Sequence, residues 1–167
     1  MRNARSISIL IILACLCSCV HKAPLSLPGG NPIFPSEFVI TQHILWQFRG
    51  KDYDFVSYAV RKQGQLNVQF FNDLGGKIFD FSMDEAGKVL VQKKPEHLPE
   101  RFITNGIGRD LWIFYNLKIP ADASGAQKIA IDQTTFEFLK NSDVPHSARI
   151  SNPSQKSILE VEILSIR

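Results

Sequence analysis

The chain has 167 residues, of which 19 are lysine or arginine and 16 are aspartate or glutamate, so its formal net charge is only +3. These charges form no basic stripe, which argues against binding to nucleic acid. By contrast, 12 phenylalanines, two tryptophans and three tyrosines make the chain rich in aromatic residues for its length. The apolar residues are therefore more informative about function than the charge.

The N-terminus predicts an export signal. Met1–Arg5 carries two arginines and no acidic residue, and Ser6–Cys17 is an almost unbroken apolar run that is too short to span a membrane as a helix. The segment Leu16–Cys19 then resembles the bacterial lipobox, in which a peptidase cuts before the cysteine and the thiol carries a diacylglycerol. Cys19 fits this motif best, and Cys15 is a second, poorer candidate.

The cysteines support a lipid anchor at Cys19. All three lie at positions 15, 17 and 19, so cleavage before Cys19 leaves one acylated cysteine and no internal disulfide. The alternative is an ordinary secretory signal that contains cysteines by chance. Val20 follows, where an aspartate would favour the inner membrane under the sorting rule of such lipoproteins. We therefore expect an N-terminal acyl anchor on the periplasmic face of the outer membrane.

The sequence divides into a signal peptide at residues 1–18, a tether and one domain. His21–Ser36 contains four of the nine prolines and a pair of glycines, a composition typical of an extended linker. We expect the lipidated cysteine and a flexible tether over residues 19–36. A single domain over residues 37–167 is long enough to bury its own core.

Five strands joined by tight turns, such as Arg49–Asp52, are predicted after the tether. Apolar and polar residues alternate along most of them, as expected for strands with one buried face. These strands span Phe38–Phe48, Tyr53–Arg61, Leu66–Phe71, Lys77–Met83 and Val89–Gln92. Their order and short turns indicate an antiparallel meander.

The third and fourth strands form the clearest hairpin. Between them lies Asn72–Gly76, a break rich in asparagine, aspartate and glycine, which is typical of a hairpin turn. Leu74 is unusual there, because an apolar side chain at the tip of a polar loop is either tucked under the loop or present for a function. Both interpretations remain open at this point.

The apolar pattern becomes helical over Pro95–Tyr115, where large apolar residues recur every four positions from Ile103 onward. We expect Gly106 and Gly108 to split this segment into two short helices. The run Asp110–Tyr115 is also compatible with a strand.

A loop at Ile119–Gly125 and four more strands complete the chain. The strands are expected at Lys128–Asp132, Thr134–Leu139, Ser147–Ser151 and Ile158–Ile166. The predicted class is mainly β (α+β): a curled antiparallel sheet, or incomplete β-barrel, with a short helical lid.

Such a curled sheet can enclose an apolar space that binds a ligand. The candidate lining residues share an inward-facing apolar position on a strand or on the lid. They are Ile44, Trp46, Phe48, Val68, Phe70, Phe79, Phe81, Phe102, Leu111 and Val161. The alternative is a packed core without a cavity.

Catalytic patterns are missing from the sequence. The four histidines share no metal-like spacing with one another, with cysteine or with a carboxylate. There is no G-x-S-x-G motif, and no glycine-rich phosphate loop precedes a helix. Acid pairs such as Asp52/Asp54 and Glu160/Glu162 are more typical of solvated strand faces. We therefore expect neither an enzyme nor a cofactor.

Several short motifs resemble the LolA/LolB family of lipoprotein carriers and receptors. They are the strand end Gln47–Gly50, the hairpin turn Asn72–Gly76, the helical run near Arg109–Leu111 and the last strand pair between Pro145 and Ile166. The order of the elements agrees as well. The resemblance is closest to an uncharacterised group of small bacterial lipoproteins often encoded beside aryl-polyene pigment genes.

The resemblance implies a role for the hairpin turn. LolB-like proteins carry an Asn-Pro-Leu-Gly segment there, whose leucine helps to insert lipoprotein cargo into the membrane. This chain has Asn72, Asp73, Leu74 and Gly75, so the leucine corresponds to Leu74 and an aspartate replaces the proline.

Two functions follow as hypotheses. The first is a monomeric outer-membrane lipoprotein that binds a lipid or a lipidated protein in an apolar cup and delivers it to the membrane, with a periplasmic LolA-like carrier as a candidate partner. The second is a structural or accessory lipoprotein of an envelope assembly or aryl-polyene export system.

Overall fold

The structure, a computed structural model, describes residues 27–120, 122–140 and 144–167. The predicted signal peptide, Cys19 and the first part of the predicted tether lie outside the described residues. The chain is mainly β, as predicted.

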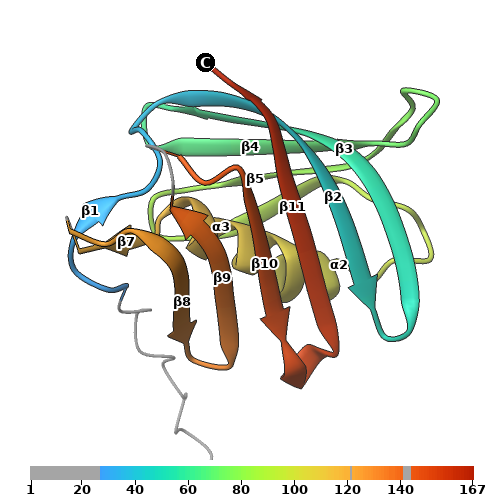
Figure 1. Ribbon diagram of the computed structural model, residues 1–167. Coiled ribbons are helices and arrows are strands. Elements are labelled where there is room, and N and C mark those ends of the chain that lie inside the picture. The colour runs from blue at the N-terminus through green and yellow to red at the C-terminus, as the bar shows by residue number, and fades with distance from the viewer. Residues whose placement is uncertain (1–26, 121, 141–143) are drawn as a thin grey trace, which may run out of the picture.

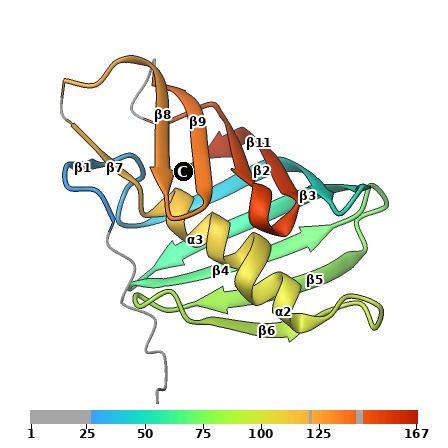
Figure 2. The same cartoon turned by 90° about the horizontal axis from the view of Figure 1, so that it is seen from below.

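Nine strands form one antiparallel sheet in the order β6-β5-β4-β3-β2-β11-β10-β9-β8. They are β2 (Phe38–Phe48), β3 (Lys51–Lys62), β4 (Gln65–Phe71), β5 (Lys77–Met83), β6 (Val89–Lys93), β8 (Gly125–Ile131), β9 (Thr134–Lys140), β10 (Ser147–Asn152) and β11 (Ser157–Ile166). The sheet is open, with β6 and β8 as its edges, and it curls around a helical segment (Figures 1 and 2).

The strands occur where the alternation of apolar and polar residues predicted them. The ends of β2 and β5 agree exactly with the prediction, while other strands are longer. β3 begins at Lys51, so the turn after β2 is shorter than predicted, and β8 already begins at Gly125. These differences arise because backbone pairing continues into polar residues that carry no apolar pattern.

The pairing of β11 with β2 joins two meanders. β2 to β6 follow one another along one half of the sheet, and β8 to β11 along the other. In the central register Trp46 lies opposite Leu159 and Ile44 opposite Val161. All four side chains are buried on the inner face.

The helical segment comprises α2 (Glu100–Phe102), η1 (Ile103–Gly108) and α3 (Arg109–Tyr115). Its backbone kinks at Gly106, whose φ and ψ are −106° and −111°, so the predicted division into two helices is confirmed. α3 excludes the strand alternative for Asp110–Tyr115. Ile103, Ile107 and Leu111 are fully buried against the inner face of the sheet, as their four-residue spacing requires.

The folded part begins earlier than residue 37, which corrects the end of the predicted tether. β1 (Asn31–Pro32) pairs with β7 (Lys118–Ile119) in a two-stranded sheet. Ile33 and Phe34 are each only 2% exposed, and the Phe34 ring lies 5.1 Å from that of Phe114. Because this proline-rich stretch has no periodic apolar pattern, the sequence did not predict that Ile33 and Phe34 pack against the end of α3.

Replacing Phe34 tests whether this segment belongs to the core. Phe34→Ala should lower the free energy of unfolding by about 3–5 kcal/mol, because it removes a fully buried ring. Urea denaturation measures this change. Leu139→Ala is the control, since Leu139 is 53% exposed and its loss should have little effect. Equal stability of Phe34→Ala and the parent chain would show that residues 31–34 are a tether after all.

Candidate functional site

The turn between β4 and β5 presents Leu74 to solvent. The Leu74 side chain is 94% exposed, the highest value among the large apolar residues that are exposed, so it is not tucked under the loop. Backbone bonds from Asn72 N to Gly76 O (3.0 Å) and from Gly75 N to Asn72 O (2.9 Å) fix the turn. Gly75 has a φ of +76°, which favours glycine at this position.

The base of this hairpin is rigid. Phe70 and Phe79 stack with their ring centroids 4.1 Å apart, and both are fully buried. The Asn72 side chain also accepts a hydrogen bond from Gly76 N at 2.7 Å. Leu74, flanked by Asp73 and Gly75, is therefore held away from the domain by a firmly packed pair of strands.

The predicted cup residues come together on the inner face of the sheet and on the helical segment. Nine of the ten are buried, and Phe102 is partly buried against the same core. They fill the interior with one another and do not line an open cup: the rings of Trp46 and Phe48 lie 5.0 Å apart, as do those of Phe48 and Phe102. In this state the side chains of the helical segment occupy the space expected for a ligand.

Polar contacts fix the C-terminal end of the helical segment. The Tyr115 hydroxyl donates to Gln42 Oε1 (2.7 Å), and Gln42 Nε2 donates to Ser57 Oγ (3.4 Å); all three residues are fully buried. Arg61 Nη1 donates to the Tyr115 carbonyl at 3.2 Å. Burial raises the pKa of the Tyr115 hydroxyl far above its ordinary value, so it remains a donor.

A second set of contacts fixes the start of α3. Arg109 Nη2 lies 2.7 Å from Asp132 Oδ2 in the turn after β8. The neighbouring Asp110 is fully buried, where Thr134 Oγ1 donates to its Oδ1 at 3.4 Å. Burial raises the pKa of the Asp110 carboxyl to about 6, and Arg109, Asn152 and Thr134 offset only part of this effect.

Asp110 should make stability depend on pH. Because its pKa in the fold exceeds its ordinary value of 3.8, the fold favours the protonated form. Its contribution is complete below pH 3.8 and is lost as pH rises through about 6, an effect of up to about 3 kcal/mol. Urea denaturation between pH 4 and 8 measures this decrease. Asp110→Asn should remove it, whereas Asp73→Asn at the exposed tip should not; an unchanged pH profile in Asp110→Asn would contradict the assignment.

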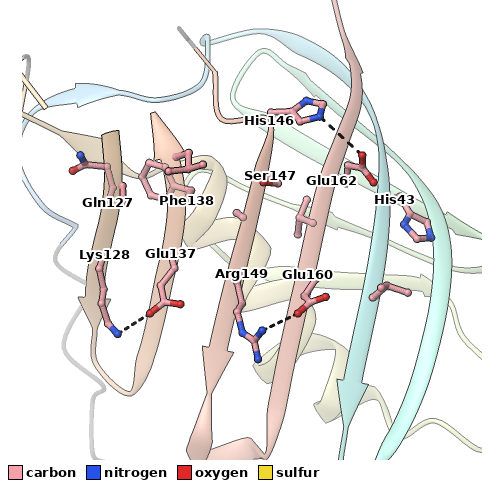
Figure 3. A pocket seen from close by; sticks show the side chains of 15 residues that line it. His43, Gln127, Lys128, Glu137, Phe138, His146, Ser147, Arg149, Glu160 and Glu162 are labelled. Atoms are coloured by element: carbon pink, nitrogen blue, oxygen red, sulfur yellow. Dashed lines mark hydrogen bonds and ion pairs between the residues drawn. The ribbon is translucent and has the colours of Figure 1, made fainter. Parts of the chain in front are cut away.

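The outward face of the sheet carries a groove of about 750 Å³ across β2, β11, β10, β9 and β8 (Figure 3). Ion pairs join neighbouring strands across it, Lys128 with Glu137 (2.7 Å) and Arg149 with Glu160 (2.9 Å), and His146 Nε2 lies 4.0 Å from Glu162 Oε1. At its edge His43 Nε2 lies 2.5 Å from Asp54 Oδ1. The Lys128–Glu137 and Arg149–Glu160 pairs each join a cationic and an anionic side chain on this face.

This groove was not predicted, because it depends on strand register. Arg149 lies directly opposite Glu160, and Lys128 directly opposite Glu137, in strands whose alignment the sequence does not specify. The acid pairs Asp52/Asp54 and Glu160/Glu162 lie on exposed strand faces, as predicted, and Glu160 in addition pairs with Arg149. Among the described residues no group of three or more histidines, cysteines or carboxylates could hold a metal ion.

Within the described part of the chain, no helix has the length and apolar character needed to cross a membrane. No model of a known protein family matches this chain, and no curated protein is significantly similar to it.

Proposed function

We propose that this protein is a non-catalytic lipoprotein of the outer membrane that binds an apolar or lipidated cargo and helps to deliver it to that membrane, in the manner of the LolA/LolB family. The observation that carries the proposal is the exposed Leu74 at the tip of a rigid hairpin. A lipid or a lipidated protein is the cargo, and a periplasmic LolA-like carrier is a candidate donor. The protein acts as a monomer and needs no cofactor.

Leu74 suits a role at a bilayer surface. Transfer of a leucine side chain from water into an apolar phase is favourable by about 1.5–3 kcal/mol. This is too little to hold the protein on a membrane, and the acyl anchor at Cys19 serves that purpose. The tip acts locally instead, by disturbing the lipid packing where a cargo acyl chain enters.

Cargo binding requires the helical segment to move, because its side chains fill the interior. Burial of Ile103, Ile107, Leu111 and Phe114 contributes about 1.5–3 kcal/mol for each side chain. An acyl chain with about 14 buried methylenes contributes about 11 kcal/mol, which is of the same order. The free energy of exchanging helical side chains for cargo is therefore close to zero, as reversible transfer requires. The segment bends at the kink at Gly106.

Replacing the tip residue tests delivery. Leu74→Glu should leave the free energy of unfolding nearly unchanged, because the side chain is exposed, but should slow the transfer of an acylated cargo protein into outer-membrane vesicles at least severalfold. Leu90→Glu is the matched control, since Leu90 is 61% exposed on β6 and away from the tip. Equal transfer by both variants, or unfolding of Leu74→Glu, would contradict the role of Leu74.

The filled interior favours a second candidate, an accessory lipoprotein of an envelope assembly or aryl-polyene export system. Protein purified from membranes separates the two: mass spectrometry should detect co-purified lipid, pigment or lipoprotein if the interior accepts cargo. A photo-crosslinker at Leu74 should then label lipid. Labelling of protein neighbours alone, with no co-purified apolar molecule, would establish the accessory role.

A further inference from the structure

Three cationic side chains gather at one rim of the domain. Arg49 lies in the turn between β2 and β3, Arg101 lies in α2, and Lys156 follows the short helix η2 (Pro153–Gln155) between β10 and β11. In Figure 1 the turn between β2 and β3 and the connection between β10 and β11 lie at the lower edge of the molecule, and α2 lies behind and above them. We propose that this rim is a binding site for a phosphate group. The proposal is independent of cargo delivery by Leu74.

Two adjoining hollows define the site. The smaller, of about 170 Å³, is lined by Arg49, Arg101, Asn105, Ser154 and Gln155 together with the rings of Phe48 and Phe102. The larger, of about 580 Å³, is lined by Arg49, Ser154, Gln155 and Lys156. Arg49, Ser154 and Gln155 are common to both. The hollows therefore adjoin at these three residues, and together they are lined by all three cationic residues.

The charge of this site is uncompensated. Neither hollow is lined by an aspartate or glutamate. In the described ranges of the chain, Arg49, Arg101 and Lys156 form no ion pair, whereas Lys77, Arg109, Lys128 and Arg149 each pair with a carboxylate. Like charges held close together repel one another, so a bound anion would relieve an unfavourable interaction in the free protein.

Packing and backbone contacts hold the three elements together. Arg49 N donates to the Lys156 carbonyl at 3.0 Å, which joins the two turns. The Gln155 side chain donates to the Asn105 carbonyl, which joins η2 to the helical segment. Both guanidinium groups lie on the Phe102 ring, with the Cζ atoms of Arg49 and Arg101 at 4.6 and 5.1 Å from its centroid. The binding groups are thus largely preorganised.

The donor set suits a phosphate. A guanidinium group stacked on a ring keeps its N–H groups free at the edge, and two N–H groups can bind two oxygens of one phosphate. Lys156 adds a compact positive charge, and the Ser154 hydroxyl adds a neutral donor. Because the rings of Phe48 and Phe102 line the same hollow, the phosphate could belong to a lipid headgroup as well as to a free ion.

Titration of the full chain in a neutral detergent with inorganic phosphate tests the site. NMR signals of the Arg49 and Arg101 side chains should shift and saturate. Arg49→Gln and Arg101→Gln should each weaken binding about tenfold, and Lys156→Gln less, because each loses charge-assisted hydrogen bonds. Lys62 is an exposed lysine at the other end of β3, so Lys62→Gln should bind phosphate as tightly as the parent chain does. Leu74→Glu should do the same.

Titration with short-chain phosphatidylglycerol below its critical micelle concentration distinguishes a lipid headgroup from a free phosphate as the ligand. Tighter binding of this lipid than of inorganic phosphate would assign the site to a headgroup, and the reverse order would assign it to a free phosphate. Shifts that never saturate with either probe would overturn the proposal. An equal loss of affinity in Lys62→Gln would do the same, because the effect would then be one of net charge alone.

Discussion

The pairing of β11 with β2 is the contact on which the rest of the structure depends. It joins residues more than one hundred positions apart and makes one sheet of two meanders. A buried hydrogen bond from Trp46 Nε1 to Ser157 Oγ (2.9 Å) fixes its register. Because Phe48 lies opposite Ser157, the turns that follow β2 and precede β11 are brought side by side. The inner face and the cationic rim therefore arise from the same long-range contact.

The helical segment completes the core that this sheet begins. Its apolar side chains fill the concave face, while polar contacts fix it at two places: Tyr115 with Gln42 at one end, and Arg109 with Asp132 near the kink. A typical hydrogen bond within a protein adds only about 0.5–1.5 kcal/mol of net stability, so these contacts contribute more to specificity of position than to stability. A segment held in this way has one defined position against the sheet.

The sequence predicted much of this fold because local patterns determine it. Alternation located the nine strands of the main sheet, and Gly106 located the kink. The docking of Phe34 was missed, since a proline-rich stretch gives no periodic signal even where it contains an anchor residue. Periodicity showed that residues such as Ile44 and Phe70 face inward, but it could not show that the helical segment fills the space before them. An apolar residue at the tip of a polar turn made Leu74 stand out in the sequence, whereas its exposure to solvent became clear only from the structure.

The pairing of β1 with β7 sets how far the domain can extend from an anchor. β1 and the Leu74 hairpin lie at opposite ends of the molecule in both ribbon views. Leu27, where the described chain begins, lies only eight positions after Cys19, and eight extended residues span at most about 28 Å. Under the proposed acylation of Cys19, the sheet of β1 and β7 therefore limits how far the folded domain can lie from the membrane, because it fixes the start of the domain close to the anchor.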